Sequence, residues 1–292
     1  MTLAAPPMPG APAAPHSPVL HARPEWREVD FISDLHLQAT EISTFEAWKR
    51  YMRTTQADAI FILGDLFEVW VGDDVISYAN DGSVDEASTS PSFEGLCAQV
   101  IKDTSSHRPV FFMHGNRDFL LGSAFATACG MTLLVDPTVL DFAEQRWVLS
   151  HGDALCLDDT DYMQFRQQVR SHEWQKSFLA KSLSERQQIA RTLRQQSETR
   201  KQQDVTFADL DTRASCQWIN SAQAATLIHG HTHKPGEHAM ESGDKKGFRR
   251  IVLSDWDAVA VPPRLEVLRI SKSSGNHGAT AIVRRFAAHQ TT

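Results

Sequence analysis

The apolar positions of this chain fall into short runs that have the length of buried strands rather than of helices. Polar residues come immediately after each of five such runs, so the C-terminal end of each predicted strand is clear. Three later segments alternate apolar and polar side chains, which is also typical of strands, and we expect them to close a second sheet. The five runs are Val29–Ser33, Ala59–Leu63, Val110–Met113, Trp147–Ser150 and Thr226–Ile228, and the alternating segments are Phe248–Leu253, Arg264–Ile270 and Ala279–Phe286.

The region between the fourth and fifth runs has a helical pattern. Tyr162–Gln203 contains no Gly or Pro, and apolar residues such as Phe165, Val169 and Phe178 recur in it at roughly helical spacing. The segment carries nine basic and three acidic side chains, a net charge of +6 within a chain of net charge -7. Two structures fit this pattern: a packed helical insertion with a solvated basic face, or a lid that holds an anionic amphiphile.

The residues that follow the five runs are good ligands for a divalent cation. Ends of neighbouring strands share one sheet edge, where α/β enzymes keep their sites. Oxygen and nitrogen ligands without Cys suit a hard or borderline ion such as Mn²⁺, and seven candidates are too many for one catalytic ion. We therefore expect two ions bridged by Asp65, with His233 near them or at the surface but not a ligand. The seven candidates are Asp34, His36, Asp65, Asn116, His151, His229 and His231.

Composition narrows the class of protein. A hydrophobic content of 41% over 292 residues is enough for a full core, in one large domain or a domain with an insertion. The net charge of -7 argues against general nucleic-acid binding, and no apolar run approaches the roughly 20 residues that span a bilayer. Four scattered cysteines without a C-x-x-C pattern are typical of reduced, buried thiols. Residues 1–25, rich in Ala and Pro, predict a disordered tail rather than a secretory signal.

The order of the motifs adds a resemblance to a known family. The set D-x-H, G-D, G-N-R-D, H-G-D and H-G-H-T-H, each after a predicted strand, resembles the calcineurin-like metallophosphoesterases. Within that superfamily the chain is similar to the UDP-2,3-diacylglucosamine diphosphatases, the pyrophosphohydrolases of lipid A biosynthesis. The resembling stretches are Phe31–Leu37, Ile62–Asp74, His114–Gly122, Gly130–Leu134, His151–Asp159 and Leu227–Pro235, in a segment from about Glu28 to about Asp257.

The resemblance implies an α/β fold, the α/β/β/α sandwich of two sheets flanked by helices, over residues 26–292, with a helical lid insertion at about 158–215. It implies hydrolysis of UDP-2,3-diacylglucosamine to 2,3-diacylglucosamine 1-phosphate (lipid X) and UMP, by water attack at the α-phosphorus in a site with two Mn²⁺ ions. The lid interpretation gains support, because the family places such an insertion over its acyl chains. We expect a cytoplasmic protein in peripheral contact with the inner membrane, binding no nucleic acid and no obligate protein partner.

The resemblance also assigns roles to single residues. Arg117 stands where most of the superfamily has His, and because its guanidinium keeps its proton we expect it to stabilise negative charge. Lys201 stands where the family has Asn. The first metal would be held by Asp34, His36, Asp65 and His231, and the second by Asp65, Asn116, His151 and His229. The expected catalytic residues are Asn116, Arg117 and His229, and the expected substrate contacts are these three with Asp159, Ser197 and Lys201.

Two other functions stay open at this point. One is a different dinuclear-metal phosphodiesterase or a nucleotide pyrophosphatase, which would act on a small substrate and would not need a basic, apolar lid. The other is a non-enzymatic scaffold, since some members of the superfamily have lost their metals and bind proteins. The filled ligand positions disfavour the scaffold.

Overall fold

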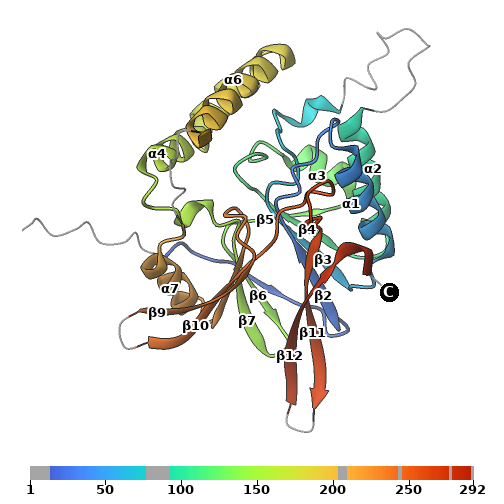
Figure 1. The fold of residues 1–292 in the computed structure, drawn as a ribbon, viewed down its shortest axis with the longest axis vertical. Coiled ribbons are helices and arrows are strands. Elements are labelled where there is room, and N and C mark those ends of the chain that lie inside the picture. Colours follow the sequence, from blue (N-terminus) through green and yellow to red (C-terminus); the bar gives the residue numbers. More distant parts are fainter. Residues whose placement is uncertain (1–13, 77–91, 203–208, 243–244, 276–277, 291–292) are drawn as a thin grey trace, which may run out of the picture.

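The computed structural model describes residues 14–76, 92–202, 209–242, 245–275 and 278–290, and within them two six-stranded sheets face each other (Figure 1). Sheet B has the strand order β12-β11-β2-β3-β4-β5. Its strands β2 to β5 pair in parallel, and the C-terminal hairpin β11–β12 joins β2 in antiparallel fashion. The strands of sheet B are β2 (Glu28–Ile32), β3 (Ala59–Leu63), β4 (Val110–Met113), β5 (Thr132–Leu134), β11 (Glu266–Gly275) and β12 (Gly278–Ala287).

Sheet A has the order β1-β6-β7-β8-β10-β9. Its central strands β7, β8 and β10 run parallel, whereas β6 and β9 are antiparallel to their neighbours β7 and β10. The strands of sheet A are β1 (Val19–His21), β6 (Thr138–Phe142), β7 (Gln145–Leu149), β8 (Thr226–His229), β9 (Gly236–Ser242) and β10 (Lys245–Val252).

The alternation of side chains along the strands builds three apolar layers. Phe31, Phe61 and Phe111 point from neighbouring strands of sheet B into the space between the sheets, where they meet Trp147 and Ile228 of sheet A. Residues one position away, such as Ile60 and Ile62, point to the other face of sheet B. Helices α1 (Ile42–Thr54), α2 (Phe93–Ser105) and α3 (Ser123–Cys129) cover that face, and α7 (Thr212–Ser221) covers sheet A. The predicted α/β/β/α sandwich is confirmed.

Three helices, not one, occupy the region predicted to be helical: α4 (Thr160–Val169), α5 (His172–Leu179) and α6 (Leu183–Gln202). Ser171 begins α5, since its hydroxyl accepts a hydrogen bond from the amide of Trp174. Ser182 and Glu185 form a reciprocal pair at the start of α6, in which the amide of Ser182 donates to Glu185 over 2.9 Å. Figure 1 shows the insertion standing over the same end of the sandwich at which the parallel strands end.

Two sequence predictions need correction. The tail expected over residues 1–25 is wrong for its last part, because Val19–His21 forms β1 and pairs in parallel with β6; residues 1–13 lie outside the described part. The three C-terminal segments do not close one second sheet together. The first, β10, lies in sheet A, whereas β11 and β12 extend sheet B.

The four cysteines are free and buried, as predicted. In the part of the chain that the structure describes, none of the helices combines the length and the apolar character needed to cross a bilayer.

Candidate dinuclear metal site

The candidate ligands come from both sheets and meet at one edge of the sandwich. Asp34 follows β2, Asp65 follows β3 and Asn116 follows β4, all in sheet B. His151 follows β7, and the segment after β8 supplies His231 and His233 from sheet A. The site therefore exists only where the strand ends of the two sheets face each other, in agreement with the strand-end argument from the sequence.

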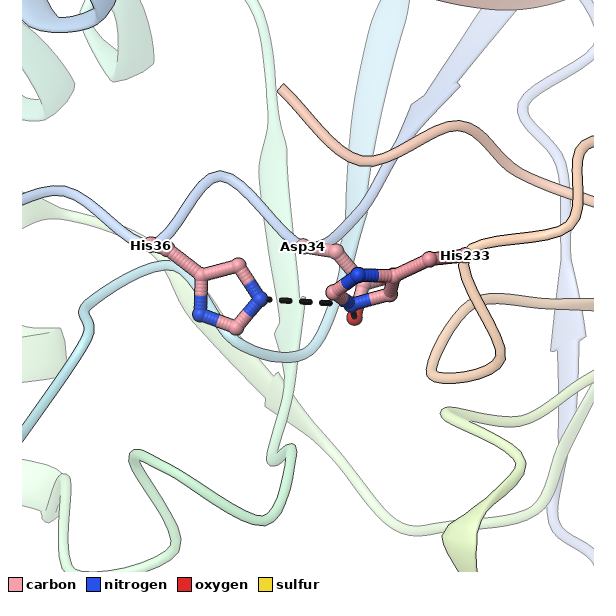
Figure 2. Close-up of side chains that lie close together, drawn as sticks. All are labelled: Asp34, His36 and His233. Atoms are coloured by element: carbon pink, nitrogen blue, oxygen red, sulfur yellow. Dashed lines mark hydrogen bonds and ion pairs between the residues drawn. The ribbon is translucent and has the colours of Figure 1, made fainter. Parts of the chain in front are cut away.

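One cluster joins Asp34, His36 and His233 (Figure 2). Nε2 of His233 lies 3.2 Å from Oδ1 of the buried Asp34 and 3.3 Å from Nε2 of His36. One carboxylate oxygen and two imidazole nitrogens thus point at a common centre. This is a donor set that a borderline divalent cation binds well.

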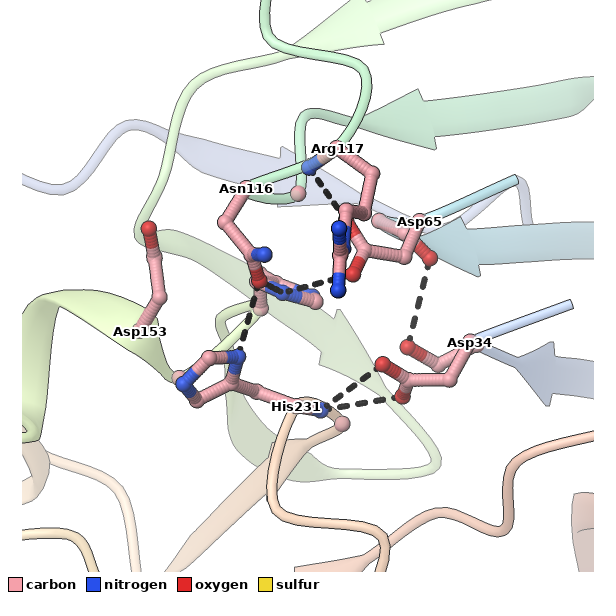
Figure 3. Close-up of polar contacts among 12 residues, drawn as sticks. Asp34, Asp65, Asn116, Arg117, Asp153 and His231 are labelled. Carbon is pink, nitrogen blue, oxygen red and sulfur yellow. Dashed lines mark hydrogen bonds and ion pairs between the residues drawn. The ribbon is translucent and has the colours of Figure 1, made fainter. Parts of the chain in front are cut away.

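A second cluster joins Asp34, Asp65 and His151, which are all buried. Nε2 of His151 lies 3.8 Å from Oδ2 of Asp65. Oδ1 of Asn116 lies 3.0 Å from Nε2 of His151 and 2.9 Å from Nδ1 of His231, so the amide stands between the two rings (Figure 3). Asp34 belongs to both clusters, and its carboxylate also accepts a hydrogen bond from the amide of His231. The side chains present therefore fit two neighbouring divalent ions.

His229, a predicted ligand, is the last residue of β8 and is fully buried. Its ring lies against Gly152, directly after His151, where an added Cβ would come within 3.1 Å of its Nδ1. Its Nδ1 donates to the carbonyl of Gly230, 2.8 Å away. Burial lowers the pKa of His229 to about 4, so the ring is neutral. Its Nε2 is buried and has no hydrogen-bond partner in the described part of the chain, and the charge of Asp34 acts on the ring, so this nitrogen is available to a cation.

Backbone conformation separates the same residues. Asp34, His36, Asp65, His231 and His233 all have φ between 48° and 67°, the left-handed region that side chains with a Cβ seldom adopt. His229 is in regular strand conformation. Residues held in such sparsely populated conformations gather at functional sites, where the surrounding structure enforces them. His233 shares this conformation with four of the seven candidates, whereas Asn116, His151 and His229 lack it.

The glycine of the H-G-H sequence permits this close approach. A Cβ on Gly230 would lie 2.3 Å from Oδ2 of Asp34 and 2.1 Å from the hydroxyl of Ser33. Only glycine lets the segment after β8 pass this near to the end of β2. The motif spacing is thus a packing requirement between the two sheets.

The electrostatics of the clusters suit a cation. Burial alone would raise the pKa of Asp34, but the hydrogen bond from His233 and the charges of His151 and His36 lower it well below its ordinary value. Burial would lower the pKa of His151, but Asp65, Asp34 and Asp153 raise it to about 9. Buried carboxylates that raise the pKa of neighbouring imidazoles carry excess negative charge, and a bound cation would be stabilised there.

Asp118, the last residue of the G-N-R-D motif, fixes the backbone around Asp65. Its carboxylate accepts hydrogen bonds from the amides of Leu66 and Gly115, over 2.7 and 2.8 Å. Burial and the charge of Asp65 raise the pKa of Asp118 to about 7. The contact orients the segment that carries the bridging candidate, rather than Arg117 or a histidine.

Arg117 is held at the same edge from two sides. Its backbone amide donates to Oδ1 of Asp65 over 2.8 Å. Its guanidinium Nη1 lies 3.6 Å from Oε1 of Glu68, a carboxylate of the segment after β3. Figure 3 shows the side chain lying beside Asp65 and Asn116, where it could meet a negative group bound at the clusters.

Basic side chains of the insertion bind a buried carboxylate at the metal edge, a contact that the net charge of the insertion did not predict. Asp153, fully buried two residues after His151, accepts hydrogen bonds from Arg166 over 2.8 Å and Tyr162 over 2.7 Å, and pairs with Arg170 at 3.3 Å. Burial would raise the pKa of Asp153, but Arg170 and Arg166 lower it well below its ordinary value. These contacts anchor α4 at the metal edge, and the ring of Tyr162 stacks on His231 at 6.0 Å.

The expected substrate contacts are described only in part. Asp159 begins α4, where its Oδ1 accepts a hydrogen bond from the amide of Tyr162. Ser197 and Lys201 lie in the last part of α6, and their side chains lie outside the described residues.

Comparison with known proteins places these features in a family. The model of the calcineurin-like phosphoesterase family matches residues 28–235. The UDP-2,3-diacylglucosamine hydrolase of Chromobacterium violaceum is 40% identical over 237 residues, which cover 78% of this chain and 90% of the relative. The enzyme of the same name from Aromatoleum aromaticum is 41% identical over 229 residues, covering 77% of this chain and 88% of the relative. The chain therefore belongs to the calcineurin-like phosphoesterases and, within them, to the UDP-2,3-diacylglucosamine hydrolase family.

Proposed function

We propose that this chain hydrolyses the pyrophosphate bond of UDP-2,3-diacylglucosamine, giving UMP and 2,3-diacylglucosamine 1-phosphate for lipid A biosynthesis. The names of its relatives support the substrate, and the paired clusters at the sheet edge support the chemistry. One bond forms and one breaks at the α-phosphorus. The oxygen of water bonds to this phosphorus, and the bond from the phosphorus to the bridging oxygen breaks. The lipid phosphate leaves with the bridging oxygen.

The sequence-based ligand set stays our proposal. We assign the first ion to Asp34, His36, Asp65 and His231, and the second to Asp65, Asn116, His151 and His229. The buried Nε2 of His229, which has no hydrogen-bond partner in the described part of the chain, supports its place in the set. His233 contacts Asp34 and His36 and is a further candidate beside the first ion, while His229 stays a proposed catalytic residue and substrate contact.

Two divalent ions, once bound, lower the pKa of water and neutralise charge on the phosphoryl group. The residues of the chain prepare the rest of the site. Asp34 belongs to both clusters, and the charge of Asp65 acts on both His36 and His151, so Asp65 is the proposed bridge. Asp118 holds the backbone beside Asp65 in place. Arg117 keeps its positive charge throughout and stabilises negative charge at the α-phosphorus. We propose Mn²⁺ as the ion, because the set combines imidazole with carboxylate and amide oxygens and contains no thiolate.

The insertion supplies the observation that carries the lipid assignment. A cavity of about 220 Å³ lies between α6 and the segment after β3, next to Arg194, which pairs with Glu68 at the edge of the site. Val69, Trp70, Val71, Val75 and Ala190 give it apolar walls, and Glu94, Gln187, Arg191 and Arg194 complete them. The lining thus combines five apolar residues with four polar or charged ones, which fits a substrate that combines acyl chains with a pyrophosphate.

Contact with a membrane belongs to the same proposal. Phe165, Leu179 and Leu193 of the insertion expose more than a third of their surface. A substrate with two acyl chains resides in a membrane, so we propose that the protein works in peripheral contact with the cytoplasmic face of the inner membrane. Residues Asp159, Ser197 and Lys201 stay proposed substrate contacts.

Product analysis in ¹⁸O-water tests the proposal. With Mn²⁺ and UDP-2,3-diacylglucosamine, the label should enter UMP and not the lipid phosphate. Burying four methylenes of the acyl chains is worth about 3 kcal/mol, so kcat/KM on UDP-glucosamine should be roughly 10²-fold lower. Asp65→Ala, which removes a ligand from both ions, serves as the inactive control. Equal efficiency on the two UDP-sugars, or faster hydrolysis of a chromogenic phosphodiester, would assign the chain to the nucleotide pyrophosphatase or phosphodiesterase alternative.

A further inference from the structure

Glu68 faces three basic side chains that belong to three different parts of the site. Its Oε2 lies 2.9 Å from Nδ1 of His36, a proposed ligand of the first ion. Its Oε1 lies 3.6 Å from Nη1 of Arg117 and 3.4 Å from Nε of Arg194 on helix α6. One carboxylate therefore contacts a metal-site histidine, the cation proposed to meet the phosphate, and the insertion.

The burial and charge of Glu68 make these contacts persistent. Only 12% of its side chain is exposed, so water screens the pairs weakly. Its backbone amide donates to the carbonyl of Leu37 over 3.2 Å, so the main chain of Glu68 is tied to the D-x-H segment itself.

The contact with Nδ1 leaves Nε2 of His36 directed at Asp34 and His233. A carboxylate on the outer nitrogen of a metal-binding histidine fixes the orientation of the ring and raises its basicity. Both oxygens of Glu68 belong to one rigid carboxylate, so fixing Oε2 against His36 also fixes Oε1. An ordered His36 therefore orders the oxygen that pairs with Arg194.

We propose that Glu68 is a positioning residue that couples the docking of helix α6 to the occupancy of the first metal position. The inference rests on the proposed function of the site, because it takes His36 as a metal ligand. Binding of the ion orders His36 and, through Glu68, strengthens the hold on Arg194, so the insertion closes over a loaded site in preference to an empty one. By linkage, docking of α6 must raise metal affinity by the same factor.

A second ion pair of the insertion offers a matched control. Asp74 pairs with Arg186 of α6, with Oδ1 2.9 Å from Nη1. This pair also holds α6 to the segment after β3, but no printed contact within the described residues joins Asp74 to a proposed metal ligand. Asp74→Asn should therefore loosen α6 without changing its response to metal.

The test measures metal binding and helix protection rather than turnover. Mn²⁺ is titrated by calorimetry, and hydrogen exchange of the α6 amides is followed with and without Mn²⁺. In the unaltered chain Mn²⁺ should slow exchange in α6. Glu68→Gln should weaken one of the two Mn²⁺ sites by roughly 10–100-fold and abolish the slowing. Arg194→Gln, which leaves the contact of Glu68 with His36 in place, should also abolish the slowing, and this variant guards against a folding defect in the first.

The outcomes separate the inference from the proposed function. If Asp74→Asn speeds exchange in α6 but keeps the effect of Mn²⁺, and Glu68→Gln loses that effect, the coupling is established. If Glu68→Gln binds Mn²⁺ like the unaltered chain, or if Mn²⁺ does not change exchange in α6 of the unaltered chain, Glu68 is an ordinary ion-pair partner and the inference is wrong. Failure of the unaltered chain to bind two Mn²⁺ ions or to cleave the diacylated substrate would instead remove the proposed function.

Discussion

The histidines after β8 decide the composition of the site at the scale of single residues. The sequence His229-Gly230-His231-Thr232-His233 allows two pairs with the same spacing. The sequence argument chose the first pair from the family motif, and no further strand end called for His233. In the structure His229 is the last residue of β8, His231 contacts Asn116 and His233 contacts Asp34, so all three histidines lie at the metal edge.

Replacing each histidine by glutamine tests this assignment. His229→Gln should reduce the metal content from two ions to one per chain and lower activity by more than the roughly 10–100-fold lost when an outer partner of a ligand is removed. The reason is that its buried Nε2, which has no hydrogen-bond partner in the described chain, is proposed to hold the second ion. His233→Gln should keep both ions, because Asp34 and His36 stay in place. Metal analysis of the purified variants measures the difference. Loss of one ion from His233→Gln alone would instead place His233 in the ligand set.

All seven predicted ligands could be proposed without a structure, since each follows a strand that the apolar pattern reveals. Hydrophobicity and spacing could not rank the histidines after β8, because His229 and His231 have the same spacing as His231 and His233. What the sequence could not provide is the set of neighbours of each ring, which depends on how closely the strand ends of the two sheets approach each other.

At the scale of elements, the W-x-G-D-D run after β3 is the joint between the sandwich and the insertion. The carboxylate of Asp73 accepts a hydrogen bond from the indole of Trp70 over 3.2 Å, and further ones from the amides of Gly122 and Phe125 at the start of α3. Asp74 points the other way and pairs with Arg186 of α6. The two acidic residues therefore hold a core helix and an insertion helix on either side of one short segment.

Gly72 makes this joint possible, and its replacement by alanine should loosen it. Its φ is 133°, and a Cβ there would lie 2.4 Å from Nη1 of Arg186 and 2.9 Å from Cδ2 of Leu179. The strained backbone alone costs about 1–3 kcal/mol. We expect Gly72→Ala to speed proteolysis of the insertion and to raise KM for the diacylated substrate.

Gly236→Ala is the matched control, because Gly236 lies in strand β9 and the atom nearest to its Cβ would belong to the flexible side chain of His238, at 3.3 Å. Equal protease sensitivity of the two alanine variants would show that Gly72 is dispensable for docking.

The ends of helices and strands could be predicted where they depend on residues that are close together in the sequence. The breaks between α4, α5 and α6 contain no Gly or Pro, but Ser182-x-x-Glu185 is a recognisable start of a helix, and the periodic apolar pattern hid it. The strand β1 was not predictable, because Val19–His21 is short, sits in an Ala- and Pro-rich segment and owes its place to pairing with β6, over a hundred residues away in the sequence.

At the scale of the whole molecule, the proposed metal site takes its ligands from two sheets. Apolar packing also holds these sheets together, and so do the hydrogen bonds from Arg285 of β12 to the carbonyls of Gly236 and Val252. Divalent ions should therefore stabilise the sandwich itself. At a free concentration 100 times Kd, each ion contributes about 2.7 kcal/mol, which corresponds to roughly 5–10 °C in Tm. Chelation should lower Tm of the unaltered chain by this amount per ion, as measured by scanning calorimetry. The Tm of Asp65→Ala should change little on chelation. A Tm of the unaltered chain that stays the same when its ions are removed would contradict a bridging site.

The position of the last hairpin has a consequence for how the protein is made. Strand β2 ends at Ile32, and its antiparallel neighbour β11 begins at Glu266, 234 residues later. At roughly 5–20 residues per second, a ribosome needs about 12–47 s to supply that neighbour. During this interval the apolar strand at the centre of sheet B has one unpaired edge, which is open to pairing with other nascent chains. Synthesis of this enzyme thus includes a waiting period, and a chain released before residue 266 would keep that edge permanently.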